Sequence, residues 1–292
     1  METTTDGFAR ELWRRLEAIH TVTYFADESK EEAAAIGLRG FWRMYFAFRA
    51  APLGVCSAGT VTAAFFGFAP SMVERAIPGV WELTTPAAAL EARTAAATRT
   101  LRRLAAVSVE TTADDPWVRG VLGDAVDHAP AGALPLFVAN RDLPVPDDPV
   151  GALWQLATTL REQRGDGHVA QWTARGVAPA EVAVLFVAAG GTERDALQPH
   201  RGWTDAEWDE AIERRTAAGH LDAGGGLTPA GRALVDEVET ATDRLADAPF
   251  VRLATTERRQ LLDALTPTAV AVGRSDLIPA INPMGVPLLA DG

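Results

Sequence analysis

Lysine is almost absent from this chain of 292 residues: Lys30 is the only one, so arginine supplies nearly all of the basic side chains. Acidic residues outnumber basic residues by 39 to 27, which gives a formal net charge of −12. A field of that sign repels DNA and anionic membrane surfaces unless a local basic patch overrides it. The composition therefore predicts a partner other than nucleic acid or a membrane.

The chain also has only one cysteine, Cys56, which excludes an intrachain disulfide and is typical of a reducing cytosol. No apolar run approaches the roughly 20 residues that a membrane-spanning helix needs. The first residues lack the basic and apolar regions of a secretory signal. P-loop, Gly-x-Gly-x-x-Gly, His-Glu-x-x-His and Gly-x-Ser-x-Gly motifs are missing as well. These absences predict a cytoplasmic protein without nucleotide-driven chemistry.

What the sequence does contain is the apolar periodicity of amphipathic helices, so we expect a mainly α fold. The threonine and glutamate of Thr204-Asp205-Ala206-Glu207 form a capping box at a helix start. Residues 107–115 are interpreted as a strand or loop, and Gly165-Asp166-Gly167-His168 as a break between two helices. The predicted helices cover residues 8–20, 27–36, 40–51, 63–77, 85–104, 118–140 (one or two helices), 150–164, 168–175, 178–189 and 204–218.

A proline-rich stretch at residues 141–149 cannot form a helix interior and predicts a linker. It would separate an N-terminal helical half, residues 1–140, from a C-terminal half, residues 150–273, followed by an irregular tail at residues 274–292. Similar strings recur in the two halves: Leu12-Trp13 matches Leu153-Trp154, and Thr85-Pro86 matches Thr228-Pro229. These pairs predict an internal duplication with a cleft between two related halves, a favoured place for small ligands.

The string Leu227-Thr228-Pro229-Ala230-Gly231 follows a run of three glycines. It resembles the end of a winged-helix domain of the MarR type, and the resemblance covers residues 203–245. It implies a recognition helix, a small β-wing and a following helix. Here, however, the helix that would enter the major groove carries four acids in its first two turns, and the wing has no arginine. The sequence therefore favours a winged helix used as a scaffold over one that contacts DNA.

Further strings are spread over most of the chain: Gly37-Leu38-Arg39-Gly40-Phe41-Trp42, Ala64-Phe65-Phe66-Gly67-Phe68 and Gly202-Trp203-Thr204 among them. In these strings the chain resembles an actinobacterial family of helix-turn-helix proteins of unknown function. The resemblance implies two degenerate winged-helix-like halves and brings no particular activity with it.

Glu17 and His20 lie three residues apart, so both side chains share one face of the predicted helix. A Glu-x-x-His pair presents a carboxylate and an imidazole to one metal ion, and His168 beside the predicted break would supply a third ligand. Two histidines and one glutamate are a common catalytic set for zinc. We predict a divalent metal, zinc or iron, with Tyr24 or Asp166 assisting proton transfer. The alternatives are a hydrogen-bonded core histidine, or a haem with His20 or His168 as its axial ligand.

An aromatic cluster lies within the first half of the chain. It favours either an aromatic core or a pocket for a flat or apolar ligand, whose orientation polar groups would fix. The cluster comprises Tyr24, Phe25, Phe41, Trp42, Tyr45, Phe46, Phe48, Phe65, Phe66 and Phe68. The candidate substrate-binding residues are Arg39, Trp42, Arg43, Tyr45, Phe65 and Phe68.

Three classes of function remain open, and the third is a purely structural or partner-binding protein. The leading hypothesis is a metal-dependent enzyme of the hydrolase or lyase type that acts on a small organic molecule. The alternative is a ligand-responsive regulator of the MarR kind or a protein that sequesters a small molecule. A regulator needs a basic surface, which Arg99, Arg102, Arg103, Arg214 and Arg215 would have to supply. Winged-helix regulators are usually dimers, so a homodimer is expected, although two fused halves would also form a monomer that mimics one.

Overall fold

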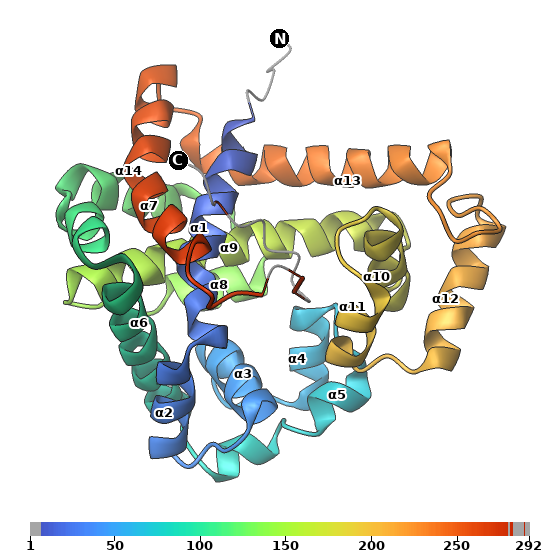
Figure 1. The fold of residues 1–292 in the computed structure, drawn as a ribbon, viewed down its shortest axis with the longest axis horizontal. Helices are drawn as coiled ribbons and strands as arrows, with labels where there is room; N and C mark the ends of the chain where they lie inside the picture. The colour runs from blue at the N-terminus through green and yellow to red at the C-terminus, as the bar shows by residue number, and fades with distance from the viewer. Residues whose placement is uncertain (1–6, 280, 283–288, 290–292) are drawn as a thin grey trace.

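The computed structural model describes residues 7–279, 281–282 and 289, and within them the chain forms helices and no strand (Figure 1). The mainly α fold expected from the apolar periodicity is confirmed. The longer helices are α1 (Phe8–Phe25), α2 (Asp27–Ala35), α3 (Phe41–Ala50), α4 (Ala58–Phe65), α5 (Pro70–Glu74), α6 (Pro86–Asp114), α7 (Pro116–His128), α8 (Pro135–Arg141), α9 (Pro149–Ala174), α10 (Pro179–Ala188), α11 (Arg194–Arg201), α12 (Asp205–Ala217), α13 (Pro229–Asp247) and α14 (Thr255–Gly273). Short 3-10 helices lie at Ala51–Leu53, Gly79–Glu82 and Ala248–Phe250.

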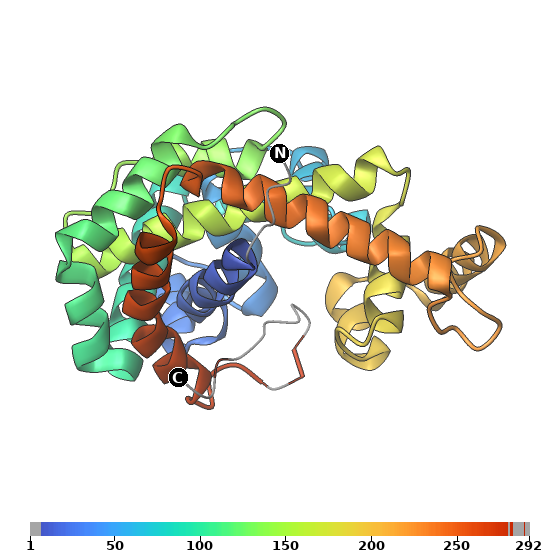
Figure 2. The same ribbon diagram turned by 90° about the horizontal axis from the view of Figure 1, so that it is seen from above.

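Helix α9 forms the centre of the molecule, because α1, α6, α7, α8 and α13 all pack against it. Leu153 and Trp154 in its first half are completely buried. Glu162 and Arg164 in its second half are buried too, although both are charged. Figures 1 and 2 show α13 crossing the molecule alongside α9. We call α1–α9 together with α14 the helical body.

The predicted break at Gly165-Asp166-Gly167-His168 is wrong, because α9 continues through these residues without interruption. A Cβ atom on Gly167 would lie 3.4 Å from Leu245 of α13, and one on Gly165 would lie 3.4 Å from the Arg161 guanidinium. Both are ordinary van der Waals distances, so neither position requires glycine, and neither glycine forms a turn. Tertiary contacts along α9 outweigh the roughly 1 kcal/mol that a glycine costs inside a helix.

The predicted strand or loop at residues 107–115 is also wrong, since α6 extends to Asp114. The helix is interrupted locally at Ala106, which has a φ of 37°. Val109 and Ala113, beyond that point, are completely buried and belong to the same core cluster as residues of α1 and α14. The interruption therefore redirects the helix without ending its packing.

Helices α10, α11 and α12 project from the helical body (Figure 1). We call these three helices, with the segment before α13, the winged helix, after the sequence resemblance of residues 203–245. Leu185, Leu197 and Trp208 of this part form a second core cluster together with Trp172 of α9 and Val238 of α13. The capping box predicted at Thr204 is confirmed: its backbone N–H donates to the Glu207 carboxylate at 2.9 Å, and the Glu207 N–H donates to its hydroxyl.

In place of a β-wing, a single antiparallel bridge joins Leu221 to Leu227. The Asp222 carboxylate accepts hydrogen bonds from the backbone N–H groups of Gly224 and Gly226 and so holds the loop closed. A Cβ atom on Gly231 would lie 2.1 Å from the His220 carbonyl oxygen. Only glycine therefore fits where α13 begins against the loop.

The two Thr-Pro strings have the same local structure. Thr85 caps α6 by accepting from the Ala88 N–H, and Thr228 caps α13 by accepting from the Gly231 N–H. The segments before them differ, since a 3-10 helix precedes α6 where the bridged loop precedes α13. The internal duplication stays a prediction from the sequence. So does the division into domains, although residues 142–148 are non-helical as expected for the linker.

Candidate functional site

Two cavities adjoin each other where the winged helix meets the helical body. The larger has a volume of about 480 Å³, and most of its wall is aromatic. One side comes from α1, α3 and the segment after α4, and the other from α11 and the segment after α14. The lining residues are Tyr24, Phe25, Phe41, Trp42, Tyr45, Phe68, Ala196, His200, Arg201, Pro279 and Ile281.

The aromatic cluster is divided between core and cavity. Phe46 and Phe48 on α3 are buried in the body at 0% and 1% exposure. Trp42 and Tyr45, on the neighbouring face of α3, line the larger cavity, and Phe68 packs against both of them. A helix that is aromatic on nearly every side can serve both purposes. The cluster therefore contributes both to the core and to the wall of a cavity.

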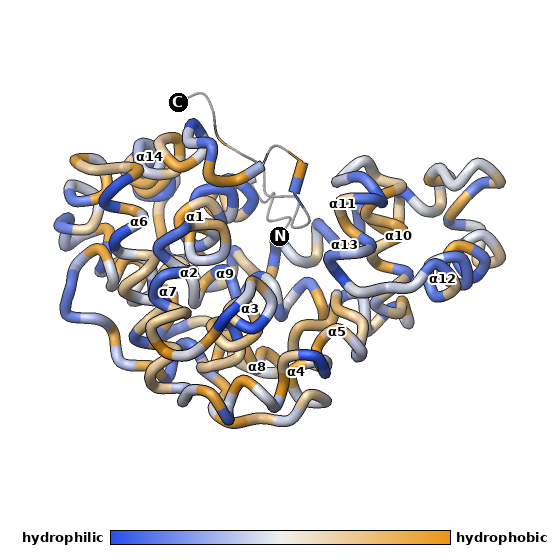
Figure 3. The backbone as a smooth tube through the Cα atoms, turned by 60° about the horizontal axis from the view of Figure 1, so that its bottom comes forward, coloured by the Kyte–Doolittle hydropathy of each residue, from blue (hydrophilic) through white to orange (hydrophobic). Residues whose placement is uncertain are grey.

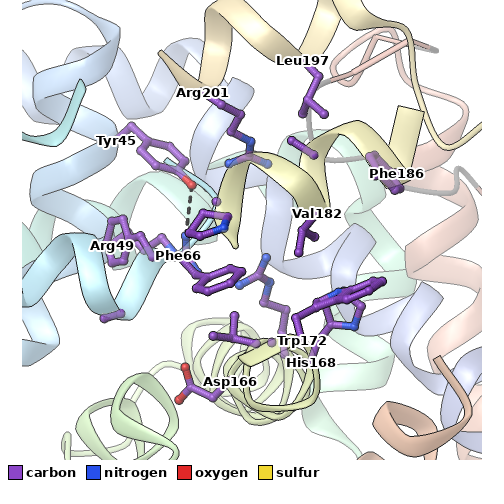
Figure 4. Close-up of a pocket in the computed structure, with 18 residues that line it drawn as sticks. Tyr45, Arg49, Phe66, Asp166, His168, Trp172, Val182, Phe186, Leu197 and Arg201 are labelled. Atoms are coloured by element: carbon purple, nitrogen blue, oxygen red, sulfur yellow. Dashed lines mark hydrogen bonds between the residues drawn. The ribbon is translucent and has the colours of Figure 1, made fainter. Parts of the chain in front are cut away.

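The smaller cavity has a volume of about 240 Å³ and contains the charged groups. Arg49 comes from α3, Arg161 from α9 and Arg201 from α11, while Asp166 and His168 lie on α9. Figure 4 shows Tyr45 and Arg201 on one side of this cavity and His168 with Trp172 on the other. The remaining wall is largely apolar and includes Phe65, Phe66, Val182, Phe186 and Leu197.

A buried network of ion pairs lies behind this wall. Glu162, which is 1% exposed, accepts from the Arg49 Nε at 3.2 Å and from the Arg161 Nη1 at 2.9 Å. Arg161 also reaches Glu17 at 3.2 Å. Burial alone would raise the pKa of Glu162, but the charges of Arg49 and Arg161 outweigh burial and lower that pKa well below its usual range. Glu162 is therefore ionised at neutral pH.

Arg201 lies at the boundary between the two cavities and lines both of them. Its guanidinium carbon lies 4.6 Å from the centre of the Phe68 ring, a cation–π contact, and its side chain hydrogen-bonds to Tyr45. Burial lowers the pKa of Arg201, and the positive charges of Arg49 and Arg161 lower it further. At the junction between the winged helix and the helical body, three arginine side chains therefore lie near one another among apolar groups.

Asp166 reaches the start of α8, where its carboxylate accepts the backbone N–H of Phe137 at 2.9 Å. Burial raises the pKa of Asp166 to about 7, and the negative charge of Glu162 acts in the same direction. The carboxyl group is therefore partly protonated at neutral pH.

Glu17 and His20 share one buried stretch of α1 as predicted, but each side chain has its own partners. Glu17 accepts from the Trp13 indole at 3.0 Å and from Arg161. The His20 Nδ1 lies 3.0 Å from the Thr158 hydroxyl, and burial lowers the pKa of His20 well below its usual value. His20 is a neutral core histidine in this arrangement.

Both ring nitrogens of His168 are engaged as well. Thr242 lies 3.1 Å from Nδ1, and the Trp172 indole donates to Nε2 at 2.9 Å. Burial lowers the pKa of His168 to about 4. Among the residues that the structure describes, no three His, Cys, Asp or Glu side chains are grouped so that they could hold a metal ion. Glu17, His20 and His168 are thus not brought together as the predicted metal set.

The other predicted site residues fall into two groups. Tyr24, Trp42, Tyr45, Phe65 and Phe68 line one or both cavities, as do Asp166 and His168. Arg39 and Arg43 are exposed and contribute to neither described lining.

Arg161 and Arg201 were not predicted as site residues, and Arg49, which is interleaved with the aromatic cluster, was not among the candidate substrate-binding residues. Arg49 follows Tyr45 by one helical turn, and a charged pair, Arg161-Glu162, interrupts an apolar helix. Both patterns were visible signals.

The outer face of the winged helix has the opposite character. Asp205, Asp209, Glu210 and Glu213 of α12 are exposed, and Figure 3 shows α12 as largely hydrophilic. Arg214 of the same helix is paired with Glu181 at 2.6 Å. The arginines that a basic surface would need are paired with acids in the same way: Arg99 with Glu31 and Glu32, Arg102 with Glu110 and Asp148, Arg103 with Glu28, and Arg215 with Glu181.

A family model described as a helix-turn-helix family matches residues 9–279. The chain belongs to this helix-turn-helix family. Its match spans both the helical body and the winged helix, so the junction between them lies within one family unit. No curated protein and no solved structure is similar enough to match the chain. In the described residues, no helix is both long enough and apolar enough to cross a membrane.

Proposed function

We propose that this helix-turn-helix family member binds a small, largely apolar organic molecule between its helical body and its winged helix. The observation that carries the proposal is the larger cavity. Its volume of about 480 Å³ lies within the range of small-molecule sites, roughly 300–1,000 Å³. Its walls come from both parts of the molecule, with Trp42 on α3 and Ala196 on α11. A ligand in this cavity contacts both α3 and α11. Binding of the ligand is therefore coupled to the position of α11.

Titration with N-phenyl-1-naphthylamine, a neutral dye that fluoresces in apolar sites, tests this function. We expect saturable binding at micromolar concentration, together with partial quenching of the tryptophan fluorescence, to which Trp42 contributes as one of eight tryptophans. The Ala196→Trp variant fills the larger cavity from the α11 side and should weaken binding at least about tenfold, because the dye and the new indole compete for the same volume.

The matched control is Ala206→Trp, which adds the same side chain to an exposed position of α12. It should bind the dye like the unmodified protein. Equal binding by Ala196→Trp and Ala206→Trp, or no saturable binding at all, would contradict the proposed site.

The contacts of the predicted metal residues give the enzyme hypothesis less support. Glu17 is held by Arg161, and both nitrogens of His168 are engaged with Thr242 and Trp172. Metal analysis and a visible spectrum of the purified protein, with His20→Ala alongside, test that hypothesis directly. About one zinc or iron per chain that is lost in the variant would restore it.

A second candidate function is a ligand-responsive regulator that binds DNA, as the MarR-like winged helix suggests. Membership of a helix-turn-helix family favours it, and so does the direct contact of α11 with the start of α12, where Gln198 donates to Asp205 at 2.9 Å. Retention on heparin at 50 mM salt that falls steeply as salt rises would support this regulator. Passage through the column without delay would count against it.

A further inference from the structure

The two cavities differ in chemistry but share two lining residues, Tyr45 and Arg201. On one side of these residues the wall is formed by rings such as Trp42 and Phe68. On the other side it contains guanidinium groups. A molecule that lies across this boundary places an apolar part among rings and a polar part among N–H donors.

Three guanidinium groups from three helices converge on the smaller cavity: Arg49 on α3, Arg161 on α9 and Arg201 on α11. Among the described residues of that lining, Asp166 provides the only carboxyl group. Glu162, which pairs with Arg49 and Arg161, lies behind the wall and is not part of it. Glu17, which pairs with Arg161, is not part of this lining either. The surface offered to a ligand therefore presents guanidinium N–H donors, with the paired acids behind them.

The electrostatic setting of these arginines favours an anion. Arg201 is buried against Phe68, and Arg49 lies over the Phe65 ring at 4.2 Å, so water screens neither charge fully. The pKa of Arg201 is lowered by burial and by the two neighbouring arginines. A negative charge in the cavity offsets that repulsion, and it does so strongly because the surroundings are apolar.

The arginine N–H donors, together with the carboxyl group of Asp166, indicate which class of anion fits the smaller cavity. A guanidinium group presents its N–H donors as a planar fork, which matches two oxygens of a carboxylate or of a phosphate. Asp166 in the same lining carries a carboxyl group that repels a doubly charged group more than a singly charged one. A monoanionic, planar head group with an attached apolar ring fits the charge, the donors and the aromatic wall together.

We infer that the molecule bound at the junction is an aromatic or alicyclic carboxylic acid, with its ring in the larger cavity and its carboxylate held by Arg201 beside Arg49 and Arg161. This inference rests on the proposed function, because it assigns the chemistry of the ligand at that same site.

Two probes of equal shape separate the inference from the function on which it rests: 2-naphthoate, which carries a carboxylate, and 2-naphthamide, which is neutral. Calorimetric titration of the full chain at pH 7.5 should show that 2-naphthoate binds at least roughly tenfold more tightly than 2-naphthamide. A factor of this size corresponds to the contribution of one charge-assisted hydrogen bond. In Arg201→Gln this ratio should fall close to one.

The matched control is Arg194→Gln, on the same helix, whose arginine points instead to Asp205 on the surface. It should keep the ratio of the unmodified protein, and circular dichroism should show that both variants are folded. Equal binding of both probes by the unmodified protein would overturn the inference and leave the proposed function standing. A ratio that survives in Arg201→Gln would overturn the role of that arginine. If neither probe binds at millimolar concentration, the proposed function fails together with the inference.

Discussion

The inner and outer sides of the winged helix differ in charge. Its inner side, where α11 faces α3 and α9, contributes Arg201 to a lining that already contains Arg49 and Arg161. Its outer side, along α12, exposes Asp209 and Glu213 to solvent. A helix that reads DNA needs the reverse arrangement, with basic and polar groups outside. Here the acids face outward, and Arg201 faces inward toward the arginines of the helical body.

The largest expected effect is the loss of stability when a buried ion pair is broken, compared with an exposed one. Glu162→Gln removes the acid that holds both Arg49 and Arg161, and leaves buried positive charge without compensation. We expect the free energy of unfolding to fall by about 3–5 kcal/mol. Glu31→Gln breaks an exposed pair with Arg99 and should leave the free energy of unfolding nearly unchanged, because water screens both charges. Urea denaturation of both variants measures the difference, and equal losses would remove the distinction between the two regions.

A smaller loss of stability should follow from protonation of His168 and His20 as the pH falls. The pKa of His168 is about 4 in the folded protein, below its value of roughly 6.5 in an unfolded chain. Folding therefore keeps this ring neutral, and its contribution to stability is complete above pH 6.5 and is lost as the pH falls toward 4. His20 acts in the same direction. Between pH 6.5 and 5 we expect His168 to account for about 1–2 kcal/mol of lost stability.

The variant His168→Gln should show a flatter dependence of stability on pH over that range, because glutamine does not titrate. His128→Gln, at an exposed position of α7, serves as the control and should keep the slope of the unmodified protein. Urea denaturation at pH 7.5, 6 and 5 measures these slopes. Identical slopes for the two variants would show that His168 is not held neutral by its surroundings.

The smallest effect is expected on the outer face of α12. The double variant Asp209→Asn with Glu213→Gln alters two exposed side chains, so the free energy of unfolding should change by less than about 0.5 kcal/mol. Binding of 2-naphthoate should not change, since neither residue lines a described cavity. A drop in naphthoate affinity comparable to that of Arg201→Gln would show that the outer face takes part in binding.

Local signals in the sequence predicted the elements that depend on local chemistry. The capping box at Thr204 and the helix start at Thr228-Pro229 form as expected, because their hydrogen bonds join residues three apart. The break expected at Gly165 does not occur. Nothing local to that segment shows that Leu245 of α13 packs against Gly167, almost 80 residues earlier in the chain.

The candidate site was predictable only in part, for a similar reason. The cluster around Trp42 and Tyr45 indicated an aromatic wall, and the interleaved arginines indicated charge beside it. Which arginines turn inward depends on contacts between distant helices: Arg49 pairs with Glu162, 113 residues away, whereas Arg43 remains exposed. Likewise Glu17, predicted as a metal ligand, pairs with Arg161 of α9, 144 residues away.

The most direct test of a ligand site at the junction is a crystal structure of the protein grown with 2-naphthoate. We expect the naphthalene ring to lie between Trp42 and Phe68, with the carboxylate within hydrogen-bonding distance of the Arg201 guanidinium. A ring bound elsewhere on the molecule, or a junction without the ligand at a concentration that saturates binding in solution, would contradict it.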